Sequence, residues 1–182
     1  MIVLGLSGMI LPLLSTGFFS EPEFLDEVVK EQVQDIVSVV SNNPNPAEAY
    51  DIRNRLVIAG AGINMALREG QSANILYRSG WVFPNTSTPD KGGNTVIFGH
   101  RFRYLPPVSN TLYSLDKVNV GDKFYIIWGG VKYDYIVSEK KVIEPIDLSV
   151  LNQTDKSAVT IVTCFPLFST KQRLVVIGEL VK

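Results

Sequence analysis

The chain contains a single cysteine, Cys164, and a single histidine, His100, among its 182 residues. One cysteine excludes an intramolecular disulfide framework. Neither sign of charge is in excess, because 17 Lys and Arg are balanced by 18 Asp and Glu. The chain also lacks a basic block long enough to follow a phosphate backbone. The sequence therefore predicts no nucleic-acid partner, and a catalytic pair of thiol and imidazole can only be Cys164 with His100.

Charge is missing altogether from the first nineteen positions, MIVLGLSGMILPLLSTGFF. That length is close to the roughly 20 apolar residues that cross a bilayer core. A cleaved signal peptide or a buried helix is the alternative, but no Ala-x-Ala-like cleavage site follows. We therefore expect residues 1–19 to be the transmembrane anchor of a single-pass protein of the cell membrane. The first charges after it are acidic, which suits a position outside the cell for the rest of the chain.

The next segment, residues 20–50, has apolar residues at steps of three and four, which is typical of one face of an amphipathic helix. These residues are Leu25, Val28, Val29, Val33, Ile36, Val37 and Val40. The helix is expected to end at SNNPNP, because proline and asparagine stop helices and favour turns. The segment is predicted to be a stalk or a cover packed on the domain that follows, joined to it by a linker.

From residue 51 the pattern changes to short runs rich in β-branched and aromatic residues, separated by Gly, Asn, Asp and Pro. Seven runs predict strands: RLVIAG, INMAL, NTVIFGH, KFYIIWGG, KYDYIVSEKKVI, AVTIVTC and RLVVIGELV. Gly129 and Gly130 predict a hairpin turn between two of them. Seven or more strands without a regular helical alternation favour a closed or nearly closed antiparallel barrel over residues 51–182.

The cysteine lies at the end of the run AVTIVTC. In a strand, Thr160, Val162 and Cys164 face one side, and the residues between them face the other. If this run pairs antiparallel with RLVVIGELV, Cys164 and Arg173 lie near each other at one end of the sheet. A guanidinium beside a thiol favours the thiolate, and it can also hydrogen-bond the oxyanion that forms when a carbonyl is attacked.

A cysteine nucleophile also needs a proton donor for the leaving group. His100 is the only imidazole, and it too follows a strand-like run, TVIF. Each of the three residues has an alternative explanation: Cys164 as a small buried apolar residue, His100 as a structural residue and Arg173 as a surface charge. Their shared position at strand ends favours a catalytic constellation.

These motifs resemble the sortases, cysteine transpeptidases of bacterial cell surfaces. The family's Thr-Leu-x-Thr-Cys strand end matches residues 160–164, with Ile161 in place of Leu, and its arginine on the next strand matches Arg173. The family's Gly-His matches the end of NTVIFGH, and the following Arg101 resembles the Gly-His-Arg of class E and some class D members. Class E members usually carry His directly after the cysteine, where this chain has Phe165.

The resemblance covers residues 51–182 and implies a mainly β fold, an eight-stranded sortase-type barrel with short helices, preceded by an N-terminal helix. It implies that Cys164 is the nucleophile that forms an acyl-thioester, His100 the general acid and base, and Arg173 the residue that stabilises the oxyanion and the substrate. Thr163, Val162 and Phe165, with the loop that continues to Lys171, would line the peptide groove.

The implied substrates are proteins with a C-terminal Leu-Pro-x-Thr-Gly-like sorting signal, cut between Thr and Gly. The acceptor would be an amine of a cell-wall precursor or of a pilin. No cofactor is expected: calcium binds some sortases, but Glu139, Glu144 and Asp147 are better explained as solvated charges, because calcium needs six to eight converging oxygens.

Two other functions remain open on the sequence. A cysteine hydrolase that releases surface proteins would use the same three residues with water as the acceptor. A non-catalytic barrel could bind peptides without using the thiol. An L,D-transpeptidase also pairs Cys with His and Arg, but it holds them in one short motif, whereas His100 and Cys164 are far apart here.

Overall fold

The structure is a computed structural model that describes residues 53–104 and 108–181. The predicted anchor over 1–19 and the predicted helix and linker over 20–50 lie outside the described residues, so both stay predictions. Within the described ranges, no helix has the length and apolar character needed to cross a membrane.

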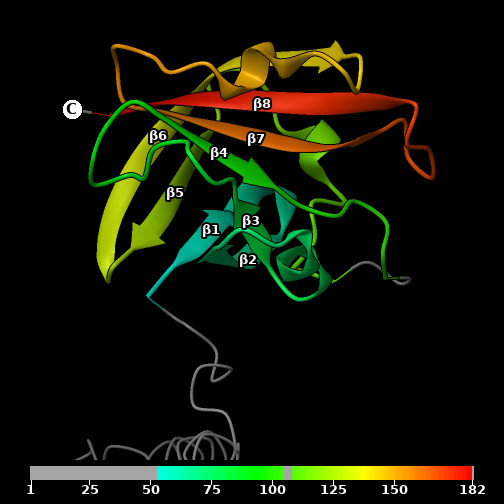
Figure 1. Cartoon of the computed structure of the whole chain (residues 1–182), viewed down its shortest axis with the longest axis horizontal. Helices are drawn as coiled ribbons and strands as arrows, with labels where there is room; N and C mark the ends of the chain where they lie inside the picture. Colours follow the sequence, from blue (N-terminus) through cyan, green and yellow to red (C-terminus); the bar gives the residue numbers. More distant parts are fainter. Residues whose placement is uncertain (1–52, 105–107, 182) are drawn as a thin grey trace, which may run out of the picture. The chain divides into compact units, whose positions relative to one another are not determined.

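The described residues form a closed eight-stranded barrel with the strand order β1-β2-β3-β4-β7-β8-β6-β5 (Figure 1). The strands are β1 (Arg55–Ile58), β2 (Ile63–Glu69), β3 (Gly80–Val82), β4 (Asn94–Phe98), β5 (Lys123–Trp128), β6 (Val131–Ile143), β7 (Ala158–Phe165) and β8 (Gln172–Leu180). Four short 3₁₀ helices connect them: η1 (Ala59–Ala61), η2 (Ala73–Tyr77), η3 (Leu115–Lys117) and η4 (Leu148–Leu151). The predicted mainly β barrel with short helices is confirmed.

Two pairings correct the prediction of an antiparallel barrel: β2 with β3 and β4 with β7 are parallel. Parallel strands are joined by long crossover connections, and the connection between β4 and β7 contains β5 and β6. No local sequence pattern therefore indicates that β4 and β7 are neighbours. Strand β3 was also absent from the seven predicted runs. It has only three residues, too few to display an alternating pattern.

The predicted hairpin joins β5 to β6, and Trp128 pairs with Val131 across its turn. Gly129 and Gly130 have φ angles of 57° and 84°. Positive φ at both central residues is the requirement of a type I′ turn, which glycine meets without steric cost. The hairpin prediction is therefore confirmed.

Strand β7 contributes to two apolar clusters, one on each face. Val159 and Ile161 are fully buried in the main core of the barrel, together with residues such as Leu56, Met65 and Ile126. Val162 packs on the other face with Val96, Val150 and Val175, where Val150 comes from η4. Because side chains alternate along a strand, Cys164 shares the face of Val162, as predicted.

Candidate active site

Cys164 and Arg173 are direct partners in the antiparallel ladder of β7 and β8. Side chains of residues opposite each other in such a ladder stand on the same face, with Cβ atoms about 4.5–5.5 Å apart. Figure 1 shows β7 and β8 side by side, with the short loop that joins them at one end of the sheet. The predicted proximity of the thiol-bearing residue and the arginine is confirmed.

His100 reaches the same end of the sheet from the other side of β7. Strand β4 runs parallel to β7 with Phe98 opposite Val162, and the Gly99 amide donates to the Val162 carbonyl at 3.2 Å. The Thr163 hydroxyl donates to the Gly99 carbonyl at 2.8 Å. These bonds carry the pairing beyond the end of β4, so His100 follows in register beside Cys164.

One row at this end of the sheet thus contains Cys164 on β7, Arg173 on β8 and His100, which lies two residues past the end of β4. All three residues are half-buried. Cysteine is among the residues most often fully buried, so a half-buried Cys164 departs from the usual position of a structural cysteine. Partial burial instead leaves each of them within reach of a substrate while part of its surface is shielded from water.

Glycine is required directly before the histidine. A Cβ at Gly99 would lie 2.8 Å from Leu112 Cδ1 and 3.2 Å from Met65 Cε, both in the main core. The Leu112 amide also donates to the His100 carbonyl at 2.8 Å. The chain can therefore bring His100 close to the core, and fix its backbone there, only because the preceding residue has no side chain.

The pKa of His100 is lowered from its ordinary value of 6.5. The larger cause is burial, which penalises the charged imidazolium, and the second is repulsion from the Arg103 guanidinium. At neutral pH the neutral imidazole is consequently the main form. Such an imidazole can accept a proton from a thiol, and the imidazolium formed in that transfer is a strong proton donor.

Arg173 is held by the backbone of the loop before β8. Its Nη1 donates to the Thr170 carbonyl at 2.9 Å and to the Gln172 carbonyl at 3.0 Å. Within residues 53–104 and 108–181, it makes no ion pair with a carboxylate. Its charge is therefore not neutralised by a fixed partner there, and its other nitrogens can serve an oxyanion or a peptide carbonyl.

The three residues predicted to line the groove have other contacts in the structure. Val162 is fully buried in the second apolar cluster, and Thr163 is buried with its hydroxyl bonded to Gly99. Phe165 packs against the main core, and the Arg101 guanidinium lies 5.5 Å from the centre of its ring. The assignment of these three side chains to a peptide groove stays a prediction.

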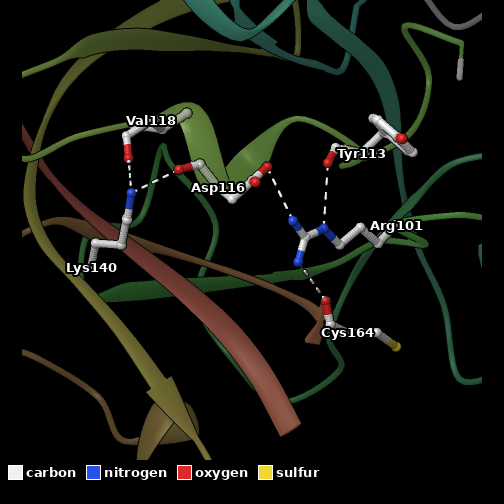
Figure 2. Close-up of polar contacts among 6 residues, drawn as sticks. All are labelled: Arg101, Tyr113, Asp116, Val118, Lys140 and Cys164. Carbon is white, nitrogen blue, oxygen red and sulfur yellow. Dashed lines mark hydrogen bonds and ion pairs between the residues drawn. The ribbon is translucent and has the colours of Figure 1, made fainter. Parts of the chain in front are cut away.

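Sequence reasoning treated Arg101 only as a mark of sortase class and missed its place at this site, where it is 3% exposed. Figure 2 shows its guanidinium between three acceptors. Its Nε donates to the Tyr113 carbonyl at 3.3 Å, its Nη1 to the Cys164 carbonyl at 3.4 Å, and its Nη2 pairs with Asp116 at 3.0 Å. The only signal in the sequence was its place directly after the histidine.

The acidic residues considered for calcium are engaged separately. Glu139 pairs with Lys141 at 3.0 Å, and Glu144 accepts from Gln172 at 3.1 Å. Asp147 caps η4 by accepting from the Ser149 amide at 2.9 Å. Its pKa is lowered by hydrogen bonding to Ser149, first to the side chain and then to the backbone amide. In the described part of the chain, no three His, Cys, Asp or Glu side chains are grouped as metal ligands.

Comparison with known proteins identifies the same family over nearly all of the barrel. The sequence profile of the sortase domain matches residues 56–181. Sortase A of Listeria monocytogenes is 27% identical over 154 residues, which cover 83% of this chain and 66% of that protein, just under two thirds of its length. Sortase A of Bacillus anthracis is 25% identical over 162 residues, 88% of this chain and 73% of that protein.

Solved structures agree with the sequence comparisons. A Clostridium perfringens sortase D5 transpeptidase superposes with a TM-score of 0.62 at 27% identity, over 86% of this chain and 95% of that one. Sortase C1 of the GBS pilus island 1 gives a TM-score of 0.64 at 25% identity, over 88% of each chain. With the sortase profile matched over residues 56–181 and these solved structures sharing its barrel, this chain belongs to the sortase family of cysteine transpeptidases.

Proposed function

We propose that this chain cleaves a C-terminal sorting signal of the Leu-Pro-x-Thr-Gly type and transfers the protein to an amine. The observation that carries the proposal is the row of three half-buried residues, His100, Cys164 and Arg173, on adjacent strand ends. Family membership supports the reaction type, since sortases in general join surface proteins to the cell wall or to pilins through a cysteine.

In the first half of the reaction, the Cys164 sulfur attacks the carbonyl carbon of the threonine before the scissile bond. His100 accepts the thiol proton, the sulfur–carbon bond forms, the carbon–nitrogen bond to glycine breaks, and the departing amine takes that proton from His100. Arg173 stabilises the oxyanion of the tetrahedral intermediate with the nitrogens that are not committed to the loop carbonyls. The product is an acyl-thioester on Cys164.

In the second half, an incoming amine attacks the thioester carbonyl and His100 accepts its proton. The new amide bond forms, the carbon–sulfur bond breaks, and the thiolate of Cys164 is regenerated for the next cycle. The lowered pKa of His100 suits this step, because the neutral imidazole is the form that can act as a base.

Exposed apolar residues near the row support a peptide substrate that begins with Leu-Pro. Ile146 is 87% exposed and Leu148 is 67% exposed, and both follow the end of β6, where Ile143 pairs with Arg173. Phe168 is 61% exposed and belongs to the loop between β7 and β8. These apolar side chains would give a leucine and a proline ring apolar partners.

Several finer assignments belong to the same proposal. Residues 1–19 would anchor the chain in the cell membrane with the barrel outside, in keeping with a family that is generally surface-associated. The Gly-His-Arg sequence and the likeness to a sortase D5 favour class D or class E. The acceptor would be a cell-wall precursor or a pilin amine.

The test is a transfer assay on the full chain in mild detergent. Leu-Pro-x-Thr-Gly and Leu-Ala-x-Thr-Gly peptides are incubated with an excess of a glycine-like amine, and products are identified by mass spectrometry beside a Cys164→Ala control. The proposal expects an amine-exchanged product cut after threonine, formed only with Cys164. Cleavage to the free acid at high amine would favour the hydrolase, and tight binding without cleavage would favour a binding barrel.

A further inference from the structure

We propose that Arg101 is a positioning residue that fixes the end of β7 against the segment carrying His100. The inference rests on the proposed function, because the spacing of Cys164 and His100 matters to a reaction only if both take part in it. It goes beyond the three reacting residues, since Arg101 bonds to the Cys164 carbonyl and not to its thiol. Figure 2 shows the Cys164 carbonyl turned toward Arg101 and the sulfur turned away.

Burial makes the contacts of Arg101 obligatory. The side chain is 2% exposed, whereas its partner Asp116 is 49% exposed. A guanidinium removed from water is tolerated only if its charge and its donors are satisfied, because each unmet group costs the lost hydration. The carboxylate of Asp116 meets the charge, and the carbonyls of Tyr113 and Cys164 occupy the remaining nitrogens. The arginine therefore cannot shift without losing several contacts together.

The three partners come from two segments distant in sequence. Tyr113 and Asp116 belong to the connection around η3, while Cys164 is the penultimate residue of β7. Arg101 itself is the neighbour of His100. One side chain thus joins the histidine segment, the η3 segment and the nucleophile strand, just beyond the last β4–β7 ladder pair and the bonds of Gly99 that follow it.

Lys140 fixes the same η3 segment from the opposite side, and this supplies a matched control. Its Nζ donates to the carbonyls of Asp116 at 2.8 Å and Val118 at 2.7 Å (Figure 2). Lys140 does not contact Cys164 in the described structure. Loosening η3 through Lys140 should therefore destabilise the fold without altering the spacing of the thiol and the imidazole.

The geometry of arginine, and not its charge alone, is what the proposal requires. A lysine at position 101 keeps the positive charge and an apolar stem that can reach Asp116. A single ammonium cannot reproduce a planar fork that meets three acceptors in different directions. Arg101→Lys should accordingly fold but hold the end of β7 less well.

The experiment compares Arg101→Lys and Lys140→Met with the wild-type full chain in the transfer assay. For Arg101→Lys we expect kcat to fall about tenfold or more with KM within about twofold, since misplacement of reacting groups is costly in the chemical step. Lys140→Met should lower the melting temperature and leave kcat unchanged. The proposal is overturned if Arg101→Lys turns over at the wild-type rate, or if Lys140→Met shows the same loss of kcat.

A second readout needs no peptide and so separates this inference from the proposed function. His100 is the only histidine, so the Hε1 proton of its ring gives a single NMR signal of that kind. Replacing Cys164 with Ala should move that signal in the otherwise wild-type chain and move it much less in the Arg101→Lys chain. An equal displacement in both, or none in the wild-type chain, would contradict the positioning role even if transfer of peptides were never observed.

Discussion

Arg173 provides the clearest residue-scale prediction. Because two loop carbonyls occupy Nη1, the remaining nitrogens form a fork that a lysine cannot reproduce. We expect Arg173→Lys to lower kcat/KM by about 10²–10³, the usual cost of losing an oxyanion donor. The measurement is the initial rate of amine exchange at low peptide concentration. A loss below about threefold would show that the guanidinium does not stabilise the oxyanion.

The protonation of His100 is also determined by its immediate neighbours. Burial and the Arg103 charge both favour the neutral ring, so its pKa should lie below 6.5 when titrated by NMR. Arg103→Gln should raise that pKa, though not to the ordinary value, because burial is the larger cause. In the pH dependence of the transfer rate, the inflection at which the His100 imidazolium loses its proton should move to higher pH by the same amount.

The control for this titration is Lys123→Gln, which removes a positive charge from β5, a strand that pairs with neither β4 nor β7. It should leave the His100 titration where it is. A fall in the pKa on removing Arg103, or an equal rise with Lys123→Gln, would show that Arg103 does not control the ring.

At the scale of elements, two buried threonines connect β7 to β4. Thr163 donates to the Gly99 carbonyl and Thr160 to Asn94 Oδ1, each at 2.8 Å. Replacing either with valine should cost about 1–3 kcal/mol of unfolding free energy, because a buried acceptor loses its donor. Only Thr163→Val should also lower kcat, because its bond fixes the residue before His100.

Denaturant melts and transfer rates of the two variants give a direct comparison. Equal losses of stability with a rate defect confined to Thr163→Val are the expected pattern. If Thr160→Val slowed transfer as much as Thr163→Val, the rate would depend on the strand pair as a whole and not on the bond next to His100.

The strands around the site were also those that the sequence predicted best. The alternation in AVTIVTC is a local pattern that predicts the two faces of β7, and from them the pairing of Cys164 with Arg173. The glycine pair is likewise a local pattern that predicts the β5–β6 turn. The parallel pairing of β4 with β7 did not follow from such a pattern, because it is decided by contacts between segments that β5 and β6 separate.

The place of Arg101 at the site was missed for a related reason. A charged residue is usually exposed, and its burial depends on acceptors at positions 113, 116 and 164 that no local pattern links to it. Val162, Thr163 and Phe165 were singled out because they adjoin the cysteine in sequence. Adjacency along a strand, however, fixes a side chain's face and leaves open whether that face is covered by other segments.

For the molecule as a whole, the closure of the barrel predicts independent folding. All eight strands of the closed barrel lie between Arg55 and Leu180. By its internal contacts, the chain from Tyr50 to Lys182 forms a unit of its own. We expect residues 50–182 to unfold cooperatively, with a melting temperature within a few degrees of the full chain, as followed by circular dichroism. Failure of this fragment to unfold cooperatively would mean that the first 49 residues are part of the folding unit.

The central claim is that Cys164 carries the peptide as a thioester, and the most direct measurement is the intact mass of the full chain quenched in acid during turnover without added amine. The account predicts an adduct equal in mass to the peptide up to threonine, removed by hydroxylamine and absent in Cys164→Ala. Cys164 is the only cysteine, so the site of the adduct is unambiguous. Product formation with no adduct on wild-type protein, or an unchanged rate with Cys164→Ala, would contradict it.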